Sequence, residues 1–154
     1  MASTIHWIPT TSDDTSHLAS IAVVGGEENY CNDKQALWVI RAQYEGDLIP
    51  GVLDTKRDTA YVPWNGEAHA VKDIEVCCAS HDEIQWIPAG DGEVPPLAVP
   101  GGKTASGETL YIGRAWEQNS LIPGKIQPSL GHLYLPFKGK EVAKKYYEVL
   151  CTVH

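Results

Sequence analysis

The sequence predicts an all-β protein of two lobes, small β-sandwiches of short antiparallel strands related by a pseudo-twofold axis. The first observation is an internal duplication. Each residue from 36 to 78 aligns without a gap to the residue 73 positions further on, and 15 of the 43 pairs are identical. The second is the period-two alternation of apolar residues in short segments, which is typical of half-buried strands. The third is punctuation by 14 glycines and 10 prolines, which leaves little room for helices.

The two repeats are predicted to span residues 1–79 and 80–154. A unit of about 70 residues buries only about 60% of its unfolded surface, so we expect the copies to share a core or an edge. The boundary is placed where Ser80-His81-Asp82 interrupts the strand pattern. These are the residue types of a catalytic triad, but three consecutive residues cannot point at one another. A linker is the favoured interpretation.

Each repeat is predicted to contribute four matched strands, rich in β-branched and aromatic residues. In chain order the pairs are 5–8 with 84–87, 36–42 with 110–116, 59–64 with 132–137, and 74–78 with 147–151. The weak helical pattern over 141–147 has no equivalent over 68–74, so these segments are predicted as loops that lead into strands. Gly25-Gly26 and Gly101-Gly102 are predicted as tight turns, because they lack the following helix that a phosphate-binding loop needs.

Composition excludes several classes of protein. A net charge of −8 argues against nucleic-acid binding, which needs a clustered basic surface. No stretch approaches the roughly 20 apolar residues of a membrane span. The N-terminus lacks the basic start and apolar run of a secretory signal, so we expect a cytoplasmic protein, unless it leaves the cell by an unconventional route.

The cysteines and histidines show no spacing that is typical of a metal site or a catalytic site. Cys77 and Cys78 point to opposite faces of a strand, and no Cys-x-x-Cys motif occurs. The four cysteines are therefore predicted to be reduced and structural, with Cys78 and Cys151 as small buried residues at strand ends. We expect neither enzymatic activity nor a cofactor.

One polar feature distinguishes the two copies. The segments 46–52 and 119–125 are both predicted as turns, and they align residue for residue. The second carries Lys125 where the first carries Val52. A lysine after Pro-Gly offers three N–H donors that suit a sugar hydroxyl or a carboxylate. A solvated surface lysine is the alternative.

Three motifs together resemble the DM-nine repeat. They are residues 107–115, then Leu121-Ile122-Pro123-Gly124-Lys125, then residues 146–151, and two tandem copies cover nearly the whole chain. The resemblance is to bivalve mannose-binding lectins and to infection-responsive insect proteins made of two such repeats. It implies a lobe of packed three-stranded sheets per repeat, an exchanged terminal strand and a homodimer. It also implies non-enzymatic recognition of microbial glycans in innate immunity.

The resemblance further implies a mannose site made of an Asp after Gly-Gly, the Lys after Pro-Gly and an acid near the start of that turn. In the second copy these positions hold Thr104, Lys125 and Ser120. In the first copy they hold Cys31, Val52 and Asp47. The acids that can substitute from adjacent loops are Asp33, Glu108 and Glu141.

A charged acceptor and a charged donor make stronger hydrogen bonds to sugar hydroxyls than neutral groups do. The second copy, which keeps Lys125, is therefore expected to dominate. Strand tryptophans such as Trp38 and Trp116 are candidates for stacking on a sugar, although strand tryptophans more often fill a core. The alternative function is a stress-response or scaffold protein that binds a protein or a vesicle surface.

Overall fold

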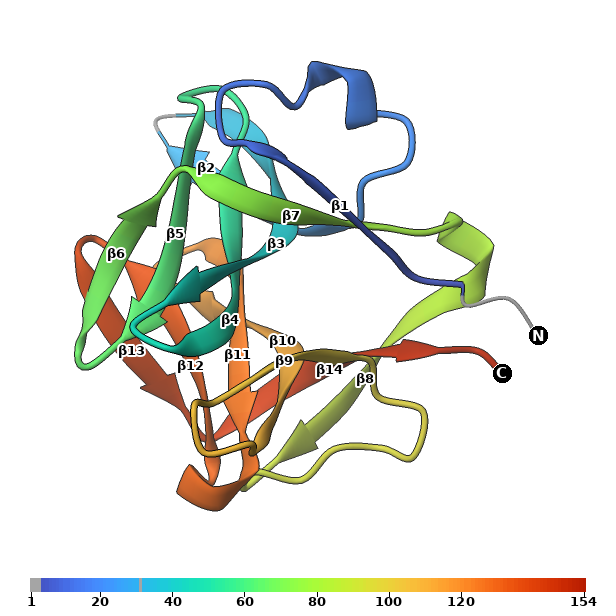
Figure 1. Cartoon of the computed structure of the whole chain (residues 1–154), viewed down its shortest axis with the longest axis vertical. Coiled ribbons are helices and arrows are strands. Elements are labelled where there is room, and N and C mark those ends of the chain that lie inside the picture. Colours follow the sequence, from blue (N-terminus) through green and yellow to red (C-terminus); the bar gives the residue numbers. More distant parts are fainter. Residues whose placement is uncertain (1–3, 31) are drawn as a thin grey trace.

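The computed structural model describes residues 4–30 and 32–154. Antiparallel strands dominate it, with three short 3-10 helices: η1 (Ser16–Leu18), η2 (His81–Glu83) and η3 (Pro128–Leu130). Figure 1 shows the first predicted repeat, in blue to green, above the second, in yellow to red, with both chain ends on one side. The predicted all-β class is confirmed. Within the described ranges, no helix has the length and hydropathy needed to cross a membrane.

The described part of each predicted repeat contains seven strands in the same order. The first seven are β1 (His6–Thr11), β2 (Val24–Tyr30), β3 (Asp33–Tyr44), β4 (Asp47–Asp54), β5 (Thr59–Trp64), β6 (Glu67–Val71) and β7 (Asp73–Cys78). Their counterparts are β8 (Ile84–Gly90), β9 (Pro100–Lys103), β10 (Thr109–Glu117), β11 (Ser120–Gln127), β12 (His132–Phe137), β13 (Lys140–Lys144) and β14 (Tyr146–Thr152).

These strands form one continuous antiparallel sheet that closes on itself. Ladder pairings link β3, β2, β11, β10, β9 and β4 in that order, and β4 returns to β3. The resulting ring takes three strands from each repeat and leaves none of them as an unpaired edge. The two predicted lobes are therefore joined by a barrel-like sheet instead of forming separate sandwiches.

Pairings between the repeats are reciprocal, as a pseudo-twofold requires. β2 of the first repeat pairs with β11 of the second, and the equivalent β9 pairs with β4. Glu67 of β6 pairs with Lys140 of β13, its own counterpart at the 73-residue offset. A residue that pairs with its own counterpart lies beside the axis, so the axis passes between β6 and β13.

Both Gly-Gly pairs lie inside strands, β2 and β9, and the prediction of tight turns was wrong. Glycine is needed there because a strand of the other repeat crosses. A Cβ on Gly26 would lie 1.8 Å from the carbonyl oxygen of Leu121. A Cβ on Gly102 would lie 2.0 Å from the carbonyl oxygen of Leu48. Only a residue without a side chain allows the two repeats to pair at these positions.

The Pro-Gly segment of each repeat is also a strand, although the sequence predicted a turn. Pro50-Gly51 lies in the middle of β4 and pairs with β3. The chain reverses earlier, at Glu45-Gly46 and at Gln118-Asn119, where both φ angles of each pair are positive. Two consecutive positive φ angles are the backbone of a tight type I′ hairpin. Lys125 therefore extends from the interior of β11.

Segments 68–74 and 141–147 were predicted as loops that lead into strands; the following strands β7 and β14 are found, but the loops are wrong. They contain most of β6 and β13, the second strand of a hairpin in each repeat. The hairpin turns are Asn65-Gly66 and Lys138-Gly139, again with positive φ at both residues. Asn-Gly is the strongest short hairpin signal, so this turn was visible in the sequence.

The terminal strands stay with their own repeats. β1 pairs with β7, and β14 pairs with β8 and β10. The exchanged terminal strand that the family resemblance implied is not found among the pairings of residues 4–30 and 32–154. The strands that join the repeats are instead β2 and β9, because each has its own repeat on one edge and the other repeat on the opposite edge.

The two repeats share an axial core. Its cluster of buried residues takes three equivalent positions from each copy: Val23, Val39, Cys77, Val99, Ile112 and Leu150. Leu37 and Val52 of the first repeat also pack into the cluster of the second. The expected sharing of a core is confirmed, and it explains how copies of this size are stabilised.

Cys77, Cys78 and Cys151 are free and buried, whereas Cys31 lies outside the described residues. Burial raises the pKa of each of these three thiols. Because the thiolate is the reactive form, we predict that a Cys31→Ser protein does not react with a thiol reagent while folded. Three equivalents should react once urea unfolds the chain. Stoichiometric labelling of the folded protein would contradict this burial.

Candidate functional site

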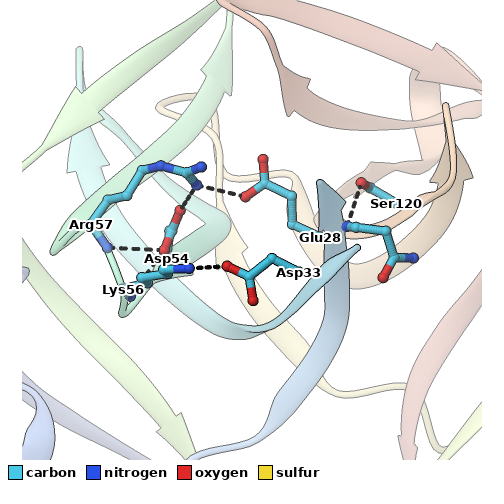
Figure 2. A network of polar contacts seen from close by, with 7 residues as sticks. Glu28, Asp33, Asp54, Lys56, Arg57 and Ser120 are labelled. Carbon is cyan, nitrogen blue, oxygen red and sulfur yellow. Dashed lines mark hydrogen bonds and ion pairs between the residues drawn. The ribbon is translucent and has the colours of Figure 1, made fainter. Parts of the chain in front are cut away.

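Polar side chains gather at two corners where the repeats meet. The first corner is defined as Glu28, Asp54, Arg57 and Ser120. The second corner is defined through the pseudo-twofold as Asp47, Thr104, Lys125 and Glu141, because their counterparts Ser120, Glu28, Val52 and Ala68 all line one cleft. Five of the six residues predicted from the sequence fall in these corners. Asp33 does not; it is exposed and forms an ion pair with Lys56 beside the first corner (Figure 2).

Each corner takes one residue from the opposite repeat. Asp47 Oδ1 accepts a hydrogen bond from the backbone N–H of Ala105 at 2.8 Å. Ser120 Oγ accepts the equivalent hydrogen bond from the backbone N–H of Asn29 at 3.2 Å. The sequence analysis grouped each residue with its own repeat, and the structure exchanges them. The cause is the pairing of β2 with β11 and of β9 with β4.

The first corner is a cleft of about 520 Å³. Its polar groups come from the end of β2, from the turn after β4 and from the turn before β11. Its apolar wall contains Leu37, Val52, Tyr61, Ile122 and Phe137. A volume in this range, with an apolar wall and a few convergent polar groups, is typical of a site for a small ligand.

Arg57 is the centre of the polar contacts in this cleft (Figure 2). Its Nη1 donates to Asp54 Oδ2 at 2.5 Å and to Glu28 Oε2 at 2.9 Å. The hydrogen bonds that Arg57 donates to Asp54 and then to Glu28 raise the pKa of Arg57. Asp54 Oδ1 also accepts the backbone N–H of Lys56 at 3.0 Å and of Arg57 at 3.1 Å. The turn after β4 thus fixes the guanidinium, whose side chain remains 50% exposed.

Glu28 and Arg57 were missed by the sequence analysis. Gly26 and Gly102 occupy equivalent crossings, so Glu28, two residues after Gly26, is the counterpart of Thr104. The constant offset of 73 had aligned Thr104 with Cys31, which lies outside the described residues. The Gly-Gly pairs carried the correct alignment. Arg57 had no such signal, because its counterpart is an exposed leucine, Leu130.

In the second corner, Lys125 forms an ion pair with Glu141. Lys125 Nζ lies 3.2 Å from Glu141 Oε2, and the two side chains are 7% and 12% exposed. Glu141 Oε1 accepts the backbone N–H of Gly66 at 2.9 Å, which ties the pair to the hairpin of the other repeat. The alternative of a solvated surface lysine is wrong, because this lysine is buried and paired.

The first repeat has replaced both members of this ion pair. At the 73-residue offset, Val52 replaces Lys125 and Ala68 replaces Glu141. Both residues line the first corner's cleft. The two corners therefore place their cation differently: an ammonium from the middle of a strand in one, and a guanidinium from a turn in the other.

Thr104 begins the loop that joins β9 to β10. Its Oγ1 accepts the backbone N–H of Glu108 at 3.1 Å and lies 3.0 Å from Ser106 Oγ. Glu108 itself faces Ser129, whose N–H and hydroxyl donate to its carboxylate at 2.8 and 2.7 Å. Burial opposes ionisation of Glu108, but these hydrogen bonds outweigh it and lower its pKa. Glu108, whose carboxylate also accepts from Gln127 Nε2 at 3.1 Å, therefore holds this loop against the chain that follows β11.

The tryptophans lie mostly outside the corners. Trp38 is buried in the first repeat's core, whereas Trp116 is 57% exposed. Trp86 stacks on Arg114, whose guanidinium carbon lies 4.2 Å from the ring centroid. Across residues 4–30 and 32–154, no three His, Cys, Asp or Glu side chains are grouped as a metal site requires.

Together these features define a tandem-repeat β protein with a polar pocket at the junction of its copies. A family model for the DM9 repeat matches residues 31–144, most of the chain. The chain therefore belongs to the DM9 repeat family. A comparison with curated proteins gives no match.

Among solved structures, the fold is similar to the nematode sperm cell motility protein MFP2B, with a TM-score of 0.73 and 13% sequence identity. The match covers 96% of this chain and 45% of MFP2B, so this chain spans less than half the length of that protein. At this level of identity, the likeness shows the fold alone.

Proposed function

We propose that this protein binds carbohydrate without catalysis, at the two corners where its repeats meet. The observation that carries the proposal is the cleft of the first corner. There a half-exposed guanidinium and two carboxylates converge beside an apolar wall. Adjacent hydroxyls of a sugar suit such alternating donors and acceptors, because hydrogen bonds to charged groups are about twice as strong as neutral ones. The less polar face of the ring suits the wall.

The second corner offers the same chemistry in another arrangement. Lys125 supplies the charged donor, while Asp47 and Glu141 supply charged acceptors. Neither corner repeats the set that the sequence analysis sought within one copy. Both corners nevertheless combine a cation, an acid and a hydroxyl once the exchange between repeats is taken into account.

Membership of the DM9 family supports mannose-type glycans as the first ligands to test. Recognition of microbial glycans in innate immunity, a homodimeric state and a cytoplasmic location belong to the same proposal.

The test is an NMR titration of the protein with methyl α-mannoside and a panel of neutral monosaccharides. We expect shifts of the amides of Glu28 and Arg57 in the first corner and of Thr104 and Lys125 in the second. Arg57→Leu, which installs the residue of the other repeat, should remove the first set of shifts and leave the second.

The matched variant for the second corner is the double replacement Lys125→Val with Glu141→Ala, which copies the first repeat. It should remove only the second set of shifts. A protein that binds no saccharide at millimolar concentration would contradict the proposal. Specific capture of a protein or vesicle partner by that same sample would then favour the alternative function.

A further inference from the structure

We propose that the first corner accepts an acidic sugar, such as a uronate, and that the second corner rejects it. This inference rests on the proposed function and names the ligand class of each corner. It arises from the different charges that the two repeats place at equivalent positions.

Arg57 keeps one edge of its guanidinium available. Asp54 and Glu28 both engage Nη1, and within residues 4–30 and 32–154 no partner is found for Nε or Nη2. These two donors lie on one side of a planar group, with the spacing of the two oxygens of a carboxylate. Because the carboxylates of the protein hold Nη1, this edge is oriented before a ligand arrives (Figure 2).

The charges of the first corner are balanced. Two cations, Arg57 and Lys138, line the cleft together with two acids, Glu28 and Asp54. Asp54 is 11% exposed and already accepts hydrogen bonds from the turn and from Arg57, so part of its charge is compensated by the protein. Lys138 Nζ donates to Gln118 Oε1 at 3.2 Å, which places a second cation at the rim. An added carboxylate therefore meets two cations there.

The second corner carries an excess of negative charge. Its cation, Lys125, is already paired with Glu141. Asp47 adds a second carboxylate, and Glu45, the counterpart of Gln118, adds a third at the adjacent turn. The sequence counterpart of Arg57 in this repeat is the uncharged Leu130, in η3. A sugar carboxylate would face uncompensated negative charge, and like charges in contact disfavour binding.

The experiment compares methyl α-mannoside with its C6-oxidised uronate, which differs only in the added carboxylate. At low ionic strength the uronate should bind the first corner about tenfold more tightly than the neutral sugar, because a charge-assisted pair is added. Its shifts should appear at Glu28 and Arg57 and not at Lys125 or Thr104. Raising the salt concentration should reduce the preference, since the ligand is partly exposed.

Three variants separate a specific contact from a general effect of charge. Arg57→Leu should abolish the preference for the uronate. Arg57→Lys keeps the charge but loses the planar edge, and it should lose most of the preference. Lys56→Leu removes a cation from the neighbouring residue, which pairs with Asp33 outside the cleft, and it should keep the preference. A thermal melt of each variant checks that it is folded.

Equal affinity of the first corner for both sugars would overturn this inference and leave the proposed function standing. A preference that survives in Arg57→Leu, or uronate shifts centred on Lys125, would overturn it as well. If neither sugar binds, the inference fails, and the proposed function fails with it when the full panel of saccharides also leaves both corners unshifted.

Discussion

Gly26→Ala or Gly102→Ala is expected to lower the free energy of unfolding by more than about 3 kcal/mol, or to prevent folding, because backbone must move. The new Cβ would lie 1.8 or 2.0 Å from a carbonyl oxygen of the other repeat. To relieve this steric clash, β2 must separate from β11, or β9 from β4. Either change opens the closed ring of strands. Urea denaturation followed by far-UV circular dichroism measures the loss.

Gly107→Ala and Gly139→Ala are the matched controls. Both glycines have positive φ, 97° and 80°, but nothing lies within 4 Å of the added Cβ. The cost there is conformational and should be only about 1 kcal/mol. If Gly26→Ala were as mild as these controls, the crossing of the two repeats would be wrong.

Replacing Lys125 with valine should destabilise the protein by about 3–5 kcal/mol, since it leaves Glu141 buried without its cation. Glu141→Ala should cost a similar amount, and it also removes the acceptor for the N–H of Gly66. The double variant should cost clearly less than the sum of the two. The first repeat already accommodates Val52 and Ala68 at these positions, so this apolar pair is compatible with the fold.

A double-mutant cycle in urea measures this coupling. Lys145→Ala is the control. Both side chains of the Lys145–Asp91 ion pair are exposed, so the pair should contribute less than about 1 kcal/mol to the free energy of unfolding. Additive effects of Lys125→Val and Glu141→Ala would show that the two residues do not act as a pair.

The duplication made much of the fold predictable. The internal duplication aligned four predicted strands of each copy, three of them at the constant offset of 73 residues, and all four pairs contain strands in the structure. Alternation gave their type, and the size of one copy indicated a shared core. Alternation is a local property of the sequence, and the size of a copy is a property of its length. Neither depends on which strands meet across the axis.

The crossing of the repeats could not be predicted in the same way. Gly25-Gly26 is compatible with a turn as well as with a close strand crossing, and only the carbonyl of Leu121 decides between them. Pro50-Gly51 likewise suggested a turn, while the actual reversal at Glu45-Gly46 was overlooked. Register between distant strands is set by such contacts, which a single sequence does not display.

The candidate site was predictable in its residues more than in its grouping. Lys125, Asp47 and Thr104 were all selected from the sequence. Asp47, however, was assigned to the site of its own repeat, whereas it lies in the corner that the second repeat mainly forms. Sites formed between repeats combine residues that no motif within one repeat contains. Arg57 is the extreme case, because the duplication itself offers only Leu130 at its position.

The central claim is that the corners between the repeats bind sugar. Its most direct test is a crystal structure of the protein soaked with methyl α-mannoside. We expect electron density for the sugar in the cleft, within hydrogen-bond distance of Glu28, Arg57 and Ser120, and a second molecule beside Lys125 and Asp47. A sugar bound elsewhere, with both corners empty in a crystal that leaves them open to solvent, would contradict the claim.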